Sequence, residues 1–270
     1  MTHLKQTYER TQIHDEWEST YRGSPLLERV NDRLMDRIVG ALHVAPGATV
    51  LDAGCGVGAH TLRLARRGYR CIGIDISRHI LAQARARMAR EGLQERVQLL
   101  CVALEDLPFR PATFDAIHCR GVLMHVPDWQ RALGNLCRVL KPGGRIAILE
   151  DNDRSLHAGL VLAARRLRIK KSKSALVRSS DGLEFWSSED GTPFVYRMAS
   201  IARIRRRLNQ DQLRVVDRFG TSLIDISLLP TGWARNAAVR FNQVASLAGV
   251  PAVLCKGNGL IAEKQRTREV

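Results

Sequence analysis

The middle of the chain alternates between two periods of apolar and polar residues. Short apolar runs bounded by turn residues predict five strands, at 49–52, 71–75, 97–102, 114–119 and 145–150. Between these runs, apolar residues recur at helical spacing and predict helices at 60–67, 78–91 and 128–140. Strands and helices that alternate in this way indicate a parallel sheet covered by helices on both faces.

The carboxyl ends of parallel strands share one edge of a sheet, and ligands bind beyond that edge. In this chain the predicted strands end at Asp52, Asp75, Val102, Cys119 and Glu150. We therefore expect the residues that follow these five positions to converge on one pocket.

The second half of the chain has a different pattern. The segment 154–178 begins as a helix, ends as a polar loop and carries eight basic residues but no acidic one. Further helices are predicted at 198–208 and 233–247, and strands at 213–219 and 259–262. No internal repeat or low-complexity linker separates these elements, which predicts a single domain over 1–270.

Composition adds an unusual charge to an otherwise ordinary globular chain. Of 270 residues, 45% are apolar and 26% charged, but the net charge is +15 and the pI about 10.3. Such an excess favours nucleic acid, a membrane surface or an anionic substrate as a partner. Residues 151–218 hold 15 basic and 8 acidic side chains, so the excess is concentrated there rather than spread along the chain.

Two further observations limit the compartment. No apolar run approaches ~18 residues and the first residues contain no apolar stretch of the kind a secretory signal needs, so a cytoplasmic protein is expected. The six cysteines stand singly, with no C-x-x-C pair, which argues against a zinc site or a disulfide framework. We expect most of them to be buried thiols.

The turn after the first strand is rich in glycine. Its residues, 52–59, read DAGCGVGA. The G-x-G-x-x-A pattern from Gly54 also fits a dinucleotide fingerprint, with Asp75 placed to hold a ribose, so an NAD oxidoreductase is an alternative. Asp52 favours another ligand, because a carboxylate repels a pyrophosphate but attracts the ammonium and sulfonium of S-adenosylmethionine.

Five ordered motifs carry a family resemblance. They are LDAGCGVGAHT (51–61), IGIDIS (72–77), EDLPF (105–109), TFDAIHCRGVLMHVPD (113–128) and LKPGGRIAI (140–148). Over residues 45–150 the chain resembles the class I S-adenosylmethionine-dependent methyltransferases, and most closely the branch with ubiquinone and menaquinone biosynthesis enzymes and many small-molecule methyltransferases. The resemblance implies S-adenosylmethionine as cofactor and an α/β fold: a Rossmann-like, doubly wound, seven-stranded, mostly parallel sheet with helices on both faces and a small helical cap.

The resemblance also implies a division of the domain. An N-terminal helical lid spans 1–44, a cofactor-binding core 45–150, a basic substrate cap 151–212, and closing strands and a helix 213–270. Tyr21 would belong to the lid over the cofactor. Because Tyr21 lies one helical turn after Trp17, packing of both rings against the sheet is the alternative.

Cofactor roles are carried over position by position. The methionine end would lie against Asp52, Gly54, Cys55 and Gly56, and the ribose hydroxyls against Asp75, with Ile76 beside the adenine. The family usually has an Asp where this chain has Ala103. The adenine would then depend on backbone groups around Leu104 and on Glu105. Arg120 replaces a small residue and would meet a carboxylate of cofactor or substrate.

Methyl transfer needs a base only when the acceptor is a poor nucleophile such as a hydroxyl. His125 in the HVPD segment is the leading candidate, and Asp151 is a second one because it follows the fifth strand. Both residues have structural alternatives, the histidine as a packing residue of its turn and the aspartate as part of a helix cap before Ser155. No metal is expected.

The acceptor is inferred from the basic segment 165–178, which could contact an anionic membrane or clamp phosphate or carboxylate groups. The resulting hypothesis is O-methylation of a small, anionic or membrane-associated metabolite: a lipid-linked glycan, a quinone precursor or a secondary metabolite. Peripheral membrane contact through 156–178 would place the enzyme in the cytoplasm or on the inner face of the membrane. An RNA or tRNA methyltransferase is the alternative, which 5% aromatic residues and the missing N-P-P-Y and Pro-Cys motifs disfavour.

Overall fold

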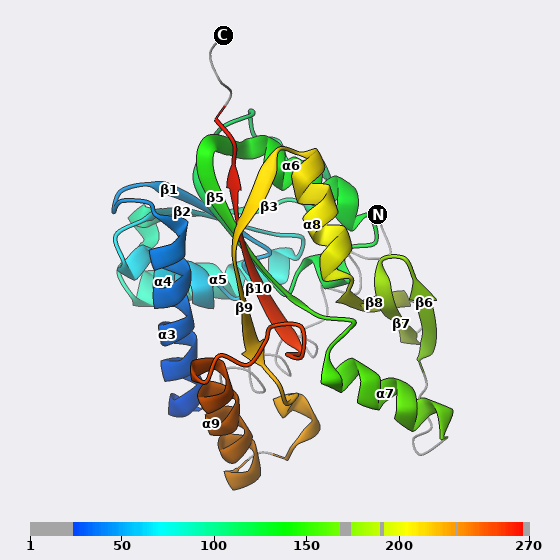
Figure 1. Ribbon diagram of the computed structural model, residues 1–270. Coiled ribbons are helices and arrows are strands. Elements are labelled where there is room, and N and C mark those ends of the chain that lie inside the picture. Colours follow the sequence, from blue (N-terminus) through cyan, green and yellow to red (C-terminus); the bar gives the residue numbers. More distant parts are fainter. Residues whose placement is uncertain (1–23, 168–173, 190–191, 231, 267–270) are drawn as a thin grey trace.

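The computed structural model describes residues 24–167, 174–189, 192–230 and 232–266 (Figure 1). Tyr21 and Trp17 of the expected lid lie outside the described residues. A single seven-stranded sheet forms the centre, with the strand order β3-β2-β1-β4-β5-β10-β9. Its strands are β1 (Thr49–Ala53), β2 (Arg70–Asp75), β3 (Val97–Cys101), β4 (Phe114–Arg120), β5 (Leu140–Asp151), β9 (Leu213–Ser222) and β10 (Gly257–Lys264).

The strand directions confirm the expected mostly parallel sheet. Strands β1 to β5 run parallel to their neighbours, and β10 runs antiparallel to both β5 and β9. Strand β5 begins at Leu140, five residues before the predicted start, because an irregularity in its pairing with β4 accommodates the Lys141-Pro-Gly-Gly segment. Such an irregularity allows one strand to contain more residues than its partner over the same stretch of the ladder.

Helices cover both faces of this sheet (Figure 1). The helices are α3 (Pro25–Leu42), α4 (Ala59–Arg66), α5 (Arg78–Arg90), α6 (Trp129–Val139), α7 (Leu156–Arg166), α8 (Ile201–Gln210) and α9 (Trp233–Leu247). Four short 3-10 helices are η1 (Gln94–Arg96), η2 (Leu104–Asp106), η3 (Leu123–His125) and η4 (Ile226–Leu228). Side-chain caps begin several helices: the hydroxyl of Ser77, for example, accepts the backbone N–H of Ile80 at the start of α5.

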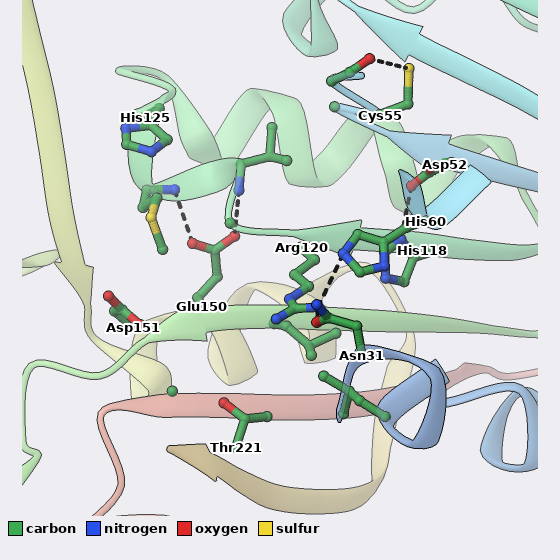
Figure 2. A pocket seen from close by; sticks show the side chains of 18 of the residues that line it. Asn31, Asp52, Cys55, His60, His118, Arg120, His125, Glu150, Asp151 and Thr221 are labelled. Carbon is green, nitrogen blue, oxygen red and sulfur yellow. Dashed lines mark hydrogen bonds and ion pairs between the residues drawn. The ribbon is translucent and has the colours of Figure 1, made fainter. Parts of the chain in front are cut away.

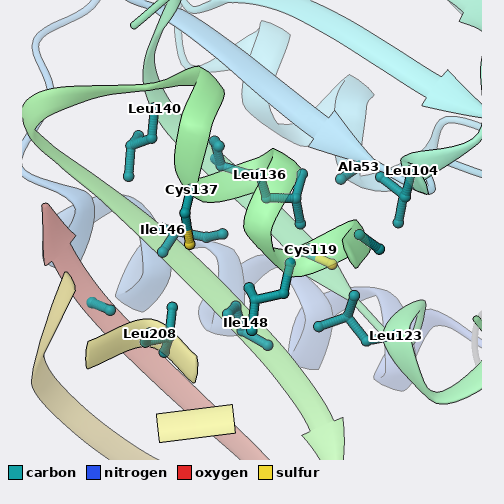
Figure 3. Close-up of a cluster of buried hydrophobic side chains, with 14 of the residues drawn as sticks. Ala53, Leu104, Cys119, Leu123, Leu136, Cys137, Leu140, Ile146, Ile148 and Leu208 are labelled. Carbon is teal, nitrogen blue, oxygen red and sulfur yellow. The ribbon is translucent and has the colours of Figure 1, made fainter. Parts of the chain in front are cut away.

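Two apolar clusters join the helices to the sheet. Helices α6 and α8 pack on one face, where Leu133, Leu136 and Leu208 are fully buried against Ile146 of β5 (Figure 3). Helices α3 and α4 pack on the other face around fully buried side chains such as Leu64. The cysteines are free thiols, five of them buried and Cys101 exposed, as expected for small core residues.

The segment between β5 and α8 differs from the small helical cap that the sequence predicts. After α7 it forms a three-stranded antiparallel sheet of β6 (Ala175–Ser179), β7 (Gly182–Glu189) and β8 (Thr192–Ala199). The expected polar loop up to residue 178 therefore includes strand β6, and the helix expected from 198 begins at Ile201. In the described part of β8, Val195, Arg197, Met198 and Ala199 are buried and Tyr196 is only partly exposed, so this strand lacks the simple alternation that would mark it in the sequence. We call α7 with this sheet the cap.

A buried arginine connects the cap with the turn that follows β4. Arg197 of β8 is 3% exposed and donates to the carbonyl oxygens of Leu123 (3.2 Å) and Val126 (3.1 Å). Its Nε pairs with Glu184 Oε1 of β7 at 2.9 Å. The guanidinium suits this site because its several donors lie in one plane and satisfy three oxygens together.

Arg197→Met should lower the free energy of unfolding by about 3–5 kcal/mol, because Glu184, whose side chain is 12% exposed, would lose its ion pair and the carbonyl oxygens of Leu123 and Val126 would lose their donor. Urea unfolding of the two proteins measures the difference. The matched control is Arg203→Met, which removes the more exposed ion pair with Asp181 (3.0 Å) and should cost at most about 1 kcal/mol. Equal losses of unfolding free energy in the two variants would contradict the stabilising role of Arg197.

Candidate active site

A cavity of about 550 Å³ lies beyond the carboxyl ends of β1, β2, β4 and β5. It brings together residues that follow all five predicted strands: Gly54, Ile76, Ala103, Arg120 and Asp151. The expected convergence on one pocket is therefore confirmed. Residues of helices α3 and α9 and of strand β10 line its other sides; Figure 2 shows several of the side chains that line it.

The glycine loop has no room for side chains at its first position. A Cβ on Gly54, where φ is +70°, would lie 2.3 Å from a methyl carbon of Val122. Gly56 differs, since φ is +52° and a Cβ there would meet no atom within 4 Å. The first glycine therefore lets the loop pack against the turn after β4, and the second presents bare backbone to open space, where a ligand can approach closely.

Asp75 at the end of β2 is held by the same loop. Its Oδ2 accepts the N–H of Gly56 at 3.0 Å and its Oδ1 accepts the N–H of Ser77 at 3.0 Å. A carboxylate oxygen can accept more than one hydrogen bond. The two backbone donors thus orient a carboxylate that lines the cavity and can accept further donors, such as a pair of hydroxyl groups.

Asp52 belongs to a buried network beneath the loop. It is 2% exposed, its Oδ2 accepts the Thr61 hydroxyl at 2.5 Å, and its Oδ1 lies 2.8 Å from Nδ1 of His118. An ionised carboxylate accepts only, so Nδ1 carries the proton. Nε2 of His118 is buried without a hydrogen-bond partner among the described residues. Because His118 also lines the cavity, this pair supplies a carboxylate and an imidazole acceptor at the cofactor side.

Arg120 ends β4 and connects it with two helices. Its Nη1 donates to Oδ1 of Asn31 on α3 at 2.9 Å and lies 3.0 Å from Nε2 of His60 on α4 (Figure 2). The guanidinium lines the cavity, as its expected role toward a carboxylate requires.

The expected adenine side is less polar. Ile76, Ala103, Leu104 and Glu105 all line the cavity, and Leu104 is 5% exposed. Burial raises the pKa of Glu105, and the neighbouring carboxylates of Asp106 and Asp128 raise it further. Cys55 also lines the cavity. The structure thus gathers every described residue that the sequence assigns to the cofactor.

Glu150, near the end of β5, is the most perturbed carboxyl group in the cavity. Its two oxygens accept the backbone N–H groups of Val122 (3.2 Å), Leu123 (3.0 Å) and Met124 (3.0 Å). The residue is 3% exposed. Burial outweighs the three donated hydrogen bonds and raises its pKa to about 8.

The opposite end of the cavity holds a group of polar residues centred on a buried lysine. Lys256, 7% exposed, pairs with Oδ2 of Asp151 at 3.0 Å and Oδ2 of Asp225 at 2.9 Å. The hydroxyl of Tyr196 donates to the same Asp151 oxygen. Burial raises the pKa of Asp225, but its pairing with Lys256 outweighs this effect and lowers it.

Asp151 therefore has one oxygen fixed and one available. No hydrogen bond is made to its Oδ1 within the described part of the chain, while Tyr196 and Lys256 hold Oδ2. A second cavity of about 270 Å³ adjoins this group and shares Tyr196, Asp225 and Lys256 with the first. Asp153 is not among the residues that line either cavity.

His125 contacts the cap. Its Nδ1 lies 3.0 Å from the carbonyl oxygen of Val195 and must donate, because a carbonyl only accepts. Burial lowers the pKa of His125 to about 4, so the ring is neutral near pH 7. His125 lines the cavity as expected, but this geometry also fits the packing alternative considered from the sequence.

The sequence did not reveal Tyr196, Lys256, Asp225 or His118 as site residues. His118 sits within an apolar run, and the other three lie in the second half, where no motif marks them. The sequence offered one signal for Lys256, which is its position directly before the last predicted strand of the sheet. Side chains from β5, β8 and β10 meet only through tertiary structure.

The residues present fit S-adenosylmethionine. A loop with bare backbone at Gly56 faces the cavity, Asp75 is oriented to accept hydroxyl donors, and the buried Nε2 of His118 lacks a partner among the described atoms. Carboxylates on this side suit a cofactor that carries an ammonium and a sulfonium group.

Comparisons with known proteins agree with this site. The sequence family described as "Methyltransferase domain" matches residues 51–148. The chain is 32% identical to 27-O-demethylrifamycin SV methyltransferase of Amycolatopsis mediterranei over 69% of this chain and 71% of that protein. It is 30% identical to demethylmenaquinone methyltransferase of Clavibacter sepedonicus over 72% and 83% of the two chains.

Other matches are shorter or more distant. Methyltransferase GfsG of Streptomyces halstedii is 36% identical, but the chain spans about half its length, 48%. Among solved structures, the [4+2]-cyclase SpnF superposes with a TM-score of 0.61 at 23% identity, over 87% of this chain and 81% of SpnF. Geranyl diphosphate C-methyltransferase of Streptomyces coelicolor gives a TM-score of 0.60 at 17% identity, over 88% and 80%. These two structures confirm the fold alone.

The fold, the glycine loop and the relatives define one class. The chain belongs to the class I S-adenosylmethionine-dependent methyltransferases, with S-adenosylmethionine as cofactor.

The raised pKa of Glu150 predicts a particular pH dependence. The folded protein holds this proton up to about pH 8, whereas the pKa of an unperturbed glutamate is 4.5. The stability from this group is therefore complete below pH 4.5 and is lost as the pH rises through about 8. Relative to Glu150→Gln, the free energy of unfolding should fall by up to about 1.4 kcal/mol more per pH unit in this range. Urea unfolding at successive pH values measures both slopes, and parallel curves would contradict the assignment.

Proposed function

We propose that this methyltransferase transfers the methyl group to a hydroxyl oxygen of a small metabolite. One observation carries the proposal. Asp151 lines the cavity that the glycine loop also lines, and Tyr196 and Lys256 hold one of its two carboxylate oxygens. A hydroxyl acceptor needs such a proton acceptor, whereas an amine or thiolate needs it less.

We assign the cofactor contacts as follows. Asp75 accepts the two ribose hydroxyls, and the network of Asp52 faces the methionine ammonium. Arg120 meets the methionine carboxylate or a carboxylate of the acceptor. The remaining contacts come from Gly54, Cys55, Gly56, Ile76, Leu104 and Glu105, all of which line the cavity. When bound, the cofactor supplies a methyl group activated by a sulfonium.

The chain's own residues then position the acceptor and remove its proton. Asp151 would take the hydroxyl proton of the acceptor, whose oxygen would receive the methyl group that the sulfonium of the bound cofactor gives up. Lys256 and Tyr196 keep this carboxylate in place. His125 is the second candidate for the base, and its Nδ1 already donates to the carbonyl oxygen of Val195. We favour Asp151 because Tyr196 and Lys256 hold one of its oxygens in place beside the cavity.

Charge in the cavity discriminates between the two acceptor classes inferred from the sequence. Among the described residues, the cavity is lined by six carboxyl groups, of which Glu150 keeps its proton up to about pH 8, but by one arginine and one lysine: Asp52, Asp75, Glu105, Glu150, Asp151, Asp225, Arg120 and Lys256. An anionic acceptor would meet net repulsion there. We therefore favour a membrane-associated acceptor, such as a quinone precursor, or a neutral secondary metabolite, in keeping with the names of the relatives.

Location is also a proposal. None of the described helices is long and apolar enough to cross a membrane. Six free cysteines suit the reducing cytoplasm. We place the enzyme there, in peripheral contact with the membrane through residues 156–178, of which 168–173 lie outside the described residues.

Calorimetry tests the cofactor site. We expect binding of S-adenosylmethionine and S-adenosylhomocysteine but not of NAD. Asp75→Asn should weaken binding of both by about tenfold or more, because a charged acceptor for two hydroxyls is lost. Asp106→Asn, which removes a carboxylate outside the cavity, is the matched control and should bind normally. Tight binding of NAD alone would refute the proposed function.

Turnover measurements test the base. The acceptor is first identified in extracts by mass spectrometry, as the compound whose product is heavier by one CH₂ group. Asp151→Asn should lower kcat by about 10²–10⁴-fold and leave cofactor affinity unchanged, because only proton removal is lost. The matched control is Asp153→Asn, at a carboxylate outside both cavities. A larger loss of kcat in His125→Gln than in Asp151→Asn would transfer the role to His125.

A further inference from the structure

Helix α9 has two apolar sides. Its inner side is buried and contributes Val239 and Asn242 to the wall of the large cavity. Its outer side carries four exposed apolar residues: Trp233 (84% exposed), Phe241 (51%), Val244 (63%) and Leu247 (85%). At 3.6 residues per turn these four lie along one stripe of the helix. Folding explains the inner stripe but gives no reason for the outer one.

The outer stripe continues into neighbouring segments. After α9 the chain exposes Val253 (42%) and Leu254 (36%), and the carbonyl of Leu254 accepts the N–H of Leu156 at the start of α7 (3.2 Å). Helix α7 then exposes Leu156 (56%) and Leu160 (70%) one turn apart. Helices α7 and α9 project from the same end of the molecule, the lower end in Figure 1. We call these exposed residues the α9–α7 face.

The charge of this face is of one sign. The sequence contains no Asp or Glu in 156–167 or in 233–256. The same ranges contain Arg165, Arg166, Arg235, Arg240 and Lys256, of which Arg166 and Arg240 are exposed. Exposed apolar residues with arginines beside them match the surface of an anionic bilayer, where headgroups attract the cations and the interface takes up the apolar side chains.

A second copy of the chain fits the face less well. In a two-fold dimer the same patch meets itself, which would bring arginines of one copy toward those of the other with no acidic residue on the face to separate them. Large exposed apolar patches on a soluble protein mark an interaction site. The charge therefore decides between the two kinds of partner.

We propose that the α9–α7 face docks on an anionic phospholipid bilayer, with the outer stripe of α9 at the level of the headgroups. The proposal deepens the suggested membrane contact, since it assigns α9 and the Val253–Leu254 loop rather than the basic segment after α7 as its main part. Only one part of the proposal rests on the proposed function, namely that docking brings the wall of the acceptor cavity close to a lipid-borne acceptor. Docking itself needs no methyl transfer.

Sedimentation of the full chain with vesicles tests the proposal. We expect binding to phosphatidylcholine vesicles that contain phosphatidylglycerol, weaker binding to phosphatidylcholine alone, and a decline with salt. The double variant Trp233→Ser, Leu247→Ser should reduce the partition coefficient by about tenfold or more. Arg240→Glu should reduce it by about tenfold, because two unit charges change at the surface.

Matched controls separate this surface from general effects. Arg90→Glu makes the same charge change at an exposed position of α5, and Val216→Ser removes an exposed apolar side chain of β9 (37%); both should bind as the parent protein does. Unchanged S-adenosylmethionine affinity and unfolding temperature would show that the variants fold.

Two results would overturn docking: no binding to phosphatidylglycerol vesicles, or a dimer in light scattering that the double variant dissociates, which would make the partner a second copy. Failure of the proposed methyl transfer would appear separately, as loss of cofactor binding or turnover with vesicle binding intact.

Discussion

A single buried carboxyl group organises the acceptor side of this enzyme. Glu150 accepts the backbone N–H groups of residues 122–124, so strand β5 fixes the turn that follows β4. Val122 of this turn fills the space that a side chain on Gly54 would need. The glycine loop, the turn and β5 therefore have one set of relative positions, and the cavity owes its shape to them.

The cap depends on the same turn. Arg197 donates to the carbonyls of Leu123 and Val126, and His125 donates to the carbonyl of Val195. Burying Glu150 costs free energy, as its raised pKa shows. Without Glu150, the three backbone N–H groups would be buried without acceptors, and this would cost more free energy than the burial of the carboxyl group.

The sequence predicted the core of the fold and much of the cofactor side. Strands β1 to β4 and helix α9 lie at or within a residue or two of their predicted ends, because glycine turns and apolar periodicity are local signals. The cap was only partly predicted: helix α7 lies in the segment predicted to begin as a helix, but strand β6 lies where a polar loop was predicted, and buried residues next to one another in β8 hide the period of a strand. The group around Lys256 could not be predicted, since its ion pair with Asp151 of β5 and the hydrogen bond from Tyr196 of β8 join segments far apart in the sequence and have no local pattern.

The tethers of the cap have one property with a wider consequence. The two bonds that Arg197 makes end, on the side of the core, at backbone carbonyls of the turn, which every amino-acid sequence provides. Substitutions among the turn's side chains leave these acceptors in place, so a cap with a different sequence can be held by the same core through one suitably placed arginine. An inherited cofactor site can in this way be combined with new acceptor pockets, and the divergence of substrate choice becomes a matter of exchanging one segment of the chain.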